Sequence, residues 1–204
     1  MKSSRQGPSC FWPIERFRDR SVIEQFFGSL GRITAILQKH DLQFALIGGL
    51  ASSIRGRVRA TADIDIVIDC DVPTAIEFLG QLDSKFYRPF VEDPELSIRQ
   101  FYILPIEDVE SRIRIDLAIG ASGFEKMVVH RASTPEGYSI PVATAEDLML
   151  MKLMAGRTQD VSDVKGIVEL HQDTIDWDYC IEIAGQLQEA FDFDLVETIR
   201  ILRR

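Results

Sequence analysis

The sequence contains few of the residues on which disulfide or zinc scaffolds depend. Its 204 residues include only 3 Cys and 3 His. The cysteines, Cys10, Cys70 and Cys180, are far apart, and none belongs to a Cys-x-x-Cys pair or lies beside a histidine cluster. A disulfide framework and a structural zinc site are therefore not expected.

Long apolar runs are also missing. No apolar segment approaches the ~18 residues that a membrane-spanning helix needs, and residues 1–20 lack the apolar stretch of a secretory signal. We therefore expect a cytoplasmic protein with no membrane partner.

An excess of positive charge is absent as well. The chain has 23 Lys+Arg against 32 Asp+Glu, a net charge of −9, which argues against a broad nucleic-acid-binding surface because phosphate binding needs clustered cations. It does not exclude a nucleotide enzyme, in which metal ions neutralise carboxylates. Residues 1–60 carry ten basic and four acidic residues (+6), whereas residues 61–204 carry thirteen and twenty-eight (−15).

The hydrophobic pattern predicts an α/β (α+β) protein in three parts. Residues 1–20 form a loose N-terminal extension, residues 21–143 an α/β core, and residues 144–204 a helical region packed on that core. Apolar periodicity and capping residues place the elements. Helices are expected at 21–40, 50–55, 71–82, from 144 onward, 160–171, 177–190 and 193–203; strands at 43–47, 64–69, 97–104, 112–119 and, more weakly, 138–142; and an acidic turn at 105–110.

Two acids occupy alternate positions of the second expected strand. Asp63 and Asp65 share one face of this strand while Ile64 and Ile66 point into the core. Two like charges on one face repel each other unless a cation lies between them. A divalent metal bound through carboxylate oxygens is one explanation, and an exposed edge strand whose acids face water is the alternative.

A third acid, Asp116, lies in another alternating segment with apolar residues on either side. If that strand lies beside the first, Asp116 joins Asp63 and Asp65 on one face. Three carboxylates on adjacent strands can hold two metal ions about 4 Å apart, an arrangement that serves phosphoryl transfer.

A glycine pair precedes these acids. Gly48 and Gly49 follow an expected strand and precede a short helix, so the backbone can approach a phosphate closely and the helix N-terminus can direct N–H groups toward it. Ser52 and Ser53 are candidate hydroxyl donors. Arg59, one of three arginines just before the acid pair, is a candidate for contact with an anionic substrate.

Together these motifs resemble the nucleotidyltransferase superfamily, the DNA polymerase β-like minimal nucleotidyltransferases. The shared pattern is an apolar strand, Gly48-Gly49, thirteen intervening residues, Asp63-Ile-Asp65 and a later apolar strand that contains Asp116. The sequence is most similar to bacterial proteins related to AbiEii-type toxin nucleotidyltransferases, whose downstream pattern matches residues 145–163. The resemblance covers residues 42–171.

This resemblance implies a mixed sheet flanked by helices, with NTP as substrate and Mg²⁺ in a two-metal site. Asp63, Asp65 and Asp116 are then the catalytic metal ligands, with Asp116 also helping to deprotonate the acceptor. Gly48 and Gly49 contact the triphosphate, and Lys152 reaches the phosphates as a mobile charge. Many members have Ser directly after the glycine pair, where this chain has Leu50, so Ser52 or Ser53 must replace that contact.

The resulting hypothesis is a metal-dependent nucleotidyltransferase that moves a nucleoside monophosphate from NTP to an acceptor and releases pyrophosphate. The acceptor is an RNA or tRNA end, a protein or a small molecule. The resemblance also raises the role of toxin in a toxin–antitoxin pair, with an antitoxin protein as partner. The alternatives are a catalytically decayed nucleotide-binding or regulatory module of the same fold, and a structural interaction protein whose acids form a calcium-dependent surface.

Overall fold

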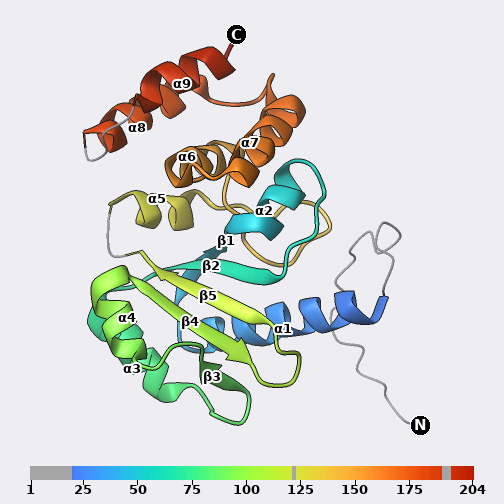
Figure 1. Ribbon diagram of the computed structural model, residues 1–204, viewed down its shortest axis with the longest axis vertical. Helices are drawn as coiled ribbons and strands as arrows, with labels where there is room; N and C mark the ends of the chain where they lie inside the picture. The colour runs from blue at the N-terminus through green and yellow to red at the C-terminus, as the bar shows by residue number, and fades with distance from the viewer. Residues whose placement is uncertain (1–19, 121–122, 190–193) are drawn as a thin grey trace.

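The structure is a computed structural model that describes residues 20–120, 123–189 and 194–204 (Figure 1). The strands of these residues form a mixed sheet of five strands in the order β1-β2-β5-β4-β3. β2 and β5 are parallel, and the other neighbours are antiparallel. The strands are β1 (Gln43–Leu46), β2 (Asp63–Asp69), β3 (Tyr87–Pro89), β4 (Ile103–Asp108) and β5 (Arg114–Ile119).

The described helices lie on both faces of the sheet and beyond its β1 edge (Figure 1). They are α1 (Arg20–Lys39), α2 (Gly48–Arg55), α3 (Val72–Gln81), α4 (Pro94–Phe101), α5 (Gly123–Arg131), α6 (Ala145–Ala155), α7 (Thr158–His171), α8 (Trp177–Gln188) and α9 (Leu195–Leu202). None of them is long and apolar enough to cross a membrane.

Alternation along the strands separates a core face from a second face. The core face carries fully buried aliphatic side chains from the three central strands, including Ile64, Ile66, Ile106, Ile115 and Leu117. Helix α1 packs on this face, since Arg32 reaches Asp108 of β4 with an Nη2–Oδ2 distance of 2.6 Å. Burying these aliphatic groups is the main stabilising contribution, at about 1.5–3 kcal/mol for each side chain.

The second face is covered at one end by α5. Lys126 and His130 of α5 both pair with Asp69 at the end of β2. The other end of β2, where Asp63 and Asp65 lie, faces α2 and the helices that follow residue 144 (Figure 1).

Buried polar contacts attach the C-terminal helices to the core. Thr144 caps α6 by accepting a hydrogen bond from the backbone N–H of Asp147. The fully buried Asp147 carboxylate accepts hydrogen bonds from Arg131 of α5 and from Tyr179 of α8. The Arg131 guanidinium also lies 3.7 Å from the centroid of the Tyr179 ring. This network connects α5, α6 and α8 through one carboxylate.

The expected strand at 97–104 is wrong. Residues 94–101 form helix α4, which begins after Asp93 with Pro94 in its first turn. The Asp93 side chain accepts a hydrogen bond from the backbone of Leu96, and the helix ends at Tyr102 in the left-handed conformation. An N-cap aspartate followed by proline is a helix-start signal, and it outweighs the local alternation of the following residues.

The expected acidic turn at 105–110 is also wrong, because β4 extends through Asp108. Its acids are balanced by arginines: Glu107 pairs with Arg88 and Arg112, and Asp108 pairs with Arg32. The turn itself covers residues 109–113. Strand β3 and helix α5 are present but were not predicted. The weak strand expected at 138–142 is not formed, and this segment contributes only isolated bridges at Val142.

The remaining elements agree with the predicted pattern to within about two residues. The predicted α/β class with a mixed sheet flanked by helices is confirmed. Residues 1–19 of the expected extension lie outside the described residues. The division at residue 143 stays a prediction.

Candidate active site

Three aspartates come together on the second face of the sheet. Asp65 of β2 lies directly opposite Asp116 of the parallel strand β5, and Asp63 lies two residues before Asp65. One carboxylate oxygen from each residue lies within 4.8 Å of the other two. The parallel pairing of β2 with β5 thus produces the juxtaposition that was expected if these two strands were neighbours.

The electrostatics of this cluster are unfavourable as they stand. Burial and, after it, the nearby carboxylates of Asp63 and Asp116 raise the pKa of Asp65 to about 6, against the lowering effects of the Gly49 N–H and of Lys152. The charged form of Asp65 is therefore costly without a cation. Carboxylate oxygens at this separation are suitable ligands for a hard divalent ion such as Mg²⁺.

Helix α2 begins against the cluster, with the glycine pair as its first two residues. Gly48 has φ +66°, and a Cβ there would lie 1.8 Å from Asp65 Oδ2. Glycine at this position is therefore what allows Asp65 to lie directly beside the helix N-terminus. The N-cap residue of α2, Ile47, makes no capping hydrogen bond with its side chain, and the Gly49 N–H donates a long hydrogen bond of 3.4 Å to Asp65.

Two neighbouring residues orient the outer aspartates. The Thr61 hydroxyl donates to Asp63 Oδ1 at 2.9 Å, and Arg114 Nε donates to Asp116 Oδ1 at 2.8 Å. Neither residue was predicted from the sequence as part of the site. For Arg114 a signal was available, since it lies two residues before Asp116 in the same alternating strand and so shares its face.

A second charged cluster lies across the pocket on α6 and α7. Lys152 Nζ lies 2.9 Å from Asp160 Oδ1 and 3.0 Å from Asp163 Oδ2, and all three side chains are buried. Arg59 binds Asp163 with both Nε and Nη2, at 2.8 and 3.0 Å. Arg157 binds Asp160 from a side chain that is 72% exposed. Burial raises the pKa values of Asp160 and Asp163, but bonds from these cations outweigh it and hold both below their usual range.

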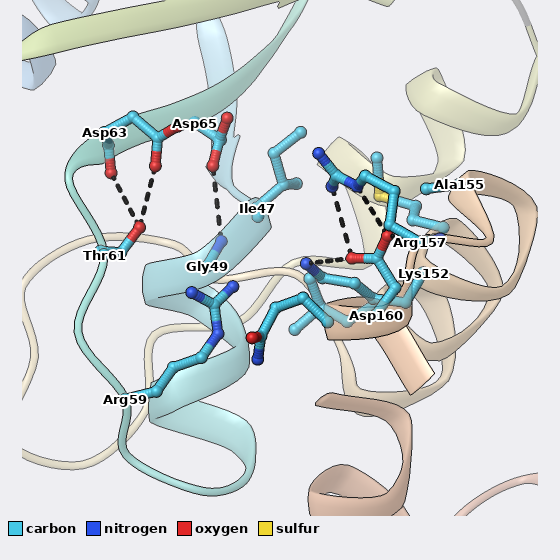
Figure 2. A pocket seen from close by; sticks show the side chains of 14 residues that line it. Ile47, Gly49, Arg59, Thr61, Asp63, Asp65, Lys152, Ala155, Arg157 and Asp160 are labelled. Atoms are coloured by element: carbon cyan, nitrogen blue, oxygen red, sulfur yellow. Dashed lines mark hydrogen bonds and ion pairs between the residues drawn. The ribbon is translucent and has the colours of Figure 1, made fainter. Parts of the chain in front are cut away.

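The two clusters face each other across a pocket of about 400 Å³ (Figure 2). Asp63 and Asp65 lie on one side and Lys152, Arg157 and Asp160 on the other, with Gly49 between them. The pocket wall mixes charged groups with apolar ones, the latter from Ile47, Leu148, Met151 and Ala155. An anionic group near α2 and a planar apolar group near α6 could both be accommodated.

The structure brings most of the predicted site residues together, but not all. Gly48, Gly49, Arg59, Asp63, Asp65 and Lys152 line the pocket, and Asp116 adjoins it through the carboxylate cluster. Lys152 is not the mobile charge that was expected, because two carboxylates hold it in a buried position.

The two serines are directed away from the pocket. Ser52 Oγ donates to the Gly48 carbonyl at 2.8 Å, and Ser53 Oγ donates to the Gly49 carbonyl at 3.0 Å. Both are buried, as is Leu50. The serines therefore stabilise α2 internally, and the position directly after the glycine pair offers no hydroxyl.

Comparison with solved structures gives neighbours of the same fold. Lincosamide antibiotic adenylyltransferase LnuA, solved with lincomycin bound, is 16% identical with a TM-score of 0.51, over 70% of this chain and 96% of that chain. ANT(2″)-Ia, solved in complex with adenylyl-2″-tobramycin, is 14% identical with a TM-score of 0.50, over 89% and 98%. JHP933 from Helicobacter pylori is 11% identical with a TM-score of 0.50, over 92% and 90%.

Comparison with curated proteins gives no match. The greater closeness to AbiEii-type proteins stays a prediction. A family model described as "Nucleotidyltransferase of unknown function (DUF6036)" matches residues 24–197. The chain therefore belongs to this family and is a nucleotidyltransferase.

Proposed function

We propose that this enzyme transfers a nucleoside monophosphate from a Mg²⁺-bound NTP to an acceptor hydroxyl and releases pyrophosphate. The observation that carries the proposal is the cluster of Asp63, Asp65 and Asp116 beside the N-terminus of α2. Helix N-termini bind phosphate groups through their backbone N–H groups and dipole. A triphosphate near Gly48 and Gly49 would thus lie next to the carboxylates.

The aspartates fit the metal that the reaction requires. Ionised carboxylates are acceptor-only oxygen ligands, and one oxygen from each of the three aspartates lies within 4.8 Å of the other two. Asp63, Asp65 and Asp116 would hold the divalent metal, which would neutralise negative charge that develops during phosphoryl transfer. Thr61 and Arg114 hold the outer carboxylates in orientation.

Side chains of the protein accept the proton and bind the phosphates during the transfer. The acceptor oxygen forms a bond to the α-phosphorus, the bond from that phosphorus to the oxygen bridging to the β-phosphate breaks, and pyrophosphate leaves. Asp116 accepts the acceptor's proton. Arg157 has the most exposed of the pocket's cationic side chains, and in this proposal it contacts the β- and γ-phosphates. Arg59, in the loop before β2, and Lys152, on α6, both pair with carboxylates of α7 and hold these segments in position.

One observation favours the second candidate, a nucleotide-binding module without turnover. Leu50 follows the glycine pair, and the hydroxyls of Ser52 and Ser53 are engaged by the α2 backbone. A phosphate contact is therefore missing unless Arg157 replaces it. Retention of three mutually repelling carboxylates favours the enzyme, because they cost stability and serve no packing purpose.

The acceptor and a toxin role are separate proposals. LnuA and ANT(2″)-Ia were solved with antibiotic compounds, which makes a small-molecule hydroxyl one candidate acceptor. RNA ends and protein side chains are the others. The toxin role, with an antitoxin partner, rests on the sequence resemblance.

Incubation with each radiolabelled NTP, Mg²⁺ and a cell extract tests the proposal. We expect label transfer by the wild type, and none by the double variant Asp63→Ala/Asp65→Ala. Mg²⁺-dependent NTP binding without transfer in any extract would favour the module. Absence of both binding and transfer would exclude both candidates.

A further inference from the structure

The second face of the sheet continues past Asp116 onto β4 and β3, where the side chains of Phe90 and Arg88 are about half exposed. Pro105 of β4 lies opposite Asp116, and the Phe90 backbone N–H donates to the Pro105 carbonyl at 2.9 Å. Phe90 therefore lies two strands away from Asp116 across the sheet, a distance of about 10 Å. The residue is 50% exposed, which is unusual for a large aromatic side chain on a sheet face.

Arg114 connects this aromatic residue to the catalytic cluster. Its guanidinium carbon lies 4.8 Å from the centroid of the Phe90 ring, while its Nε donates to Asp116. Among the described residues, the hydrogen bonds of Arg114 are made by Nε alone, so both terminal nitrogens remain available to a ligand. The side chain is 42% exposed.

The same surface carries further positive charge. Arg88 of β3 lies opposite Glu107, which in turn lies opposite Arg114. Arg88 and Arg112 both bind the single oxygen Glu107 Oε1, at 2.7 and 2.9 Å. Two cations therefore share one carboxylate, and both arginine side chains are more than half exposed. Together with the Arg114–Asp116 pair, this surface holds three arginines and two carboxylates in a chain of net charge −9.

We propose that Phe90, Arg88 and Arg114 form the acceptor subsite and that the acceptor is a nucleotide unit. The base stacks on Phe90, the phosphate pairs with the arginines, and the sugar hydroxyl reaches Asp116. Aromatic rings bind bases by stacking without regard to sequence, and arginine forks match phosphate geometry. The proposal rests on the proposed function, because it takes Asp116 as the acid on the acceptor side.

The chemistry of this surface also argues against a polycationic acceptor. An aminoglycoside carries several ammonium groups, and the three arginines would repel them. The shared chemistry of base, sugar and phosphate is found both in a mononucleotide and at the 3′ end of an RNA strand. The experiment must therefore distinguish these two sources.

Fluorescence anisotropy with a 5′-labelled, single-stranded oligoribonucleotide that has a 3′-hydroxyl tests the subsite directly. Unlabelled nucleoside monophosphate and an aminoglycoside serve as competitors. Binding of a non-hydrolysable NTP analogue with Mg²⁺ is measured separately, and the oligonucleotide titration is done with this analogue present and absent. Thermal unfolding of each variant checks folding.

We expect Phe90→Ala to weaken oligonucleotide binding by about tenfold or more, the usual effect of losing one stacking platform. Arg88→Glu should weaken it and reduce its salt dependence, whereas Phe90→Trp and Arg88→Lys should retain it. The matched controls are Phe101→Ala and Arg99→Glu on α4, whose side chains are similarly exposed. Neither control should change binding, and no variant should change binding of the NTP analogue.

The proposal is overturned if the oligonucleotide does not bind, if Phe90→Ala and Phe101→Ala bind it equally, or if the aminoglycoside binds more tightly than the nucleotides. Tighter binding of the strand than of the monophosphate identifies an RNA end, and equal binding identifies the mononucleotide. Failure of the wild type to bind the NTP analogue contradicts the proposed function instead, and the effect of Phe90→Ala is then still measured with the oligonucleotide alone.

Discussion

Gly48 is the residue at which backbone geometry and charge arrangement are most tightly connected. Its positive φ and its contact with Asp65 leave no room for a Cβ. Gly48→Ala should therefore displace Asp65 or the first turn of α2, destabilise the protein by about 1–3 kcal/mol and abolish NTP binding. Gly31→Ala is the matched control, because nothing lies within 4 Å of its added Cβ in the middle of α1. The Gly31→Ala variant should stabilise α1 by about 0.5–1 kcal/mol. Thermal unfolding and NTP titration measure both effects, and equal behaviour of the two variants would contradict the assigned role.

Asp65, in contrast to Gly48, is a residue whose ionised side chain lowers the free energy of unfolding. Its pKa of about 6 lies above the usual value, so its ionised form opposes folding at neutral pH. Asp65→Asn should raise the free energy of unfolding in metal-free buffer at pH 8 by up to about 3 kcal/mol, at 1.36 kcal/mol per pKa unit. The variant should lose the stabilisation that Mg²⁺ confers on the wild type. Unfolding with EDTA and with Mg²⁺ measures both. If the variant is less stable than the wild type without metal, the ionised Asp65 carboxylate does not oppose folding as described.

At the scale of elements, Lys152 holds α6, α7 and the loop before β2 together. Its ammonium lies between the buried carboxylates of Asp160 and Asp163. Lys152→Met should leave these acids without their shared cation and cost about 3–5 kcal/mol, as is usual when one partner of a buried pair is removed. Lys126→Met removes an exposed partner of Asp69 and should cost no more than about 1 kcal/mol. Urea unfolding compares the two, and similar losses would contradict a special role for the buried cluster.

The elements also show what the sequence can and cannot predict. Asp63 and Asp65 were predictable, because period two places them on one face whatever the neighbouring strands are. Their proximity to Asp116 required the pairing of β2 with β5, which motif resemblance supplied and local pattern did not. Helix α4 was not predicted, because residues 97–104 alternate as a strand does, although Asp93 and Pro94 form a helix start. Strand β4 was missed because Pro105 and two acids are unusual in a central strand, and the arginines that balance the acids come from α1, β3 and the β4–β5 turn.

At the scale of the whole molecule, buried carboxylates determine the response to acid. Burial raises the pKa of Asp108, but hydrogen bonds from Arg32 and from the Ser111 backbone outweigh it and hold the pKa below the usual value. Asp160 and Asp163 behave in the same way. Because their folded-state pKa values are lowered, these groups contribute stability that is present above pH about 4 and is lost as the pH falls through those values.

The melting temperature should accordingly fall as the pH is lowered from about 4. Asp108→Asn should be less stable than the wild type at pH 7 and should show a shallower decline in acid. Glu110→Gln, which changes an exposed partner of the same arginine, is the control and should follow the wild type. A wild-type melting temperature that stays constant down to pH 3 would show that these pairs contribute little.

The overall charge takes on a more specific meaning in the folded molecule. A net charge of −9 argues against a broad phosphate-binding surface, but basic side chains lie at the pocket and on the sheet face beyond Asp116. The excess of carboxylates includes Asp63, Asp65 and Asp116, the three that we propose bind a divalent cation. Acidity of the chain and a nucleotide substrate are therefore compatible.

The most direct test of the central claim is to compare NTP labelled at the α-phosphate with NTP labelled at the γ-phosphate, using Mg²⁺ and an acceptor-containing extract. Nucleotidyl transfer predicts that the α-label appears on the acceptor while the γ-label appears only in pyrophosphate, and that both signals disappear in Asp63→Ala/Asp65→Ala. Transfer of the γ-label to the acceptor, or release of both labels without transfer, would contradict the account.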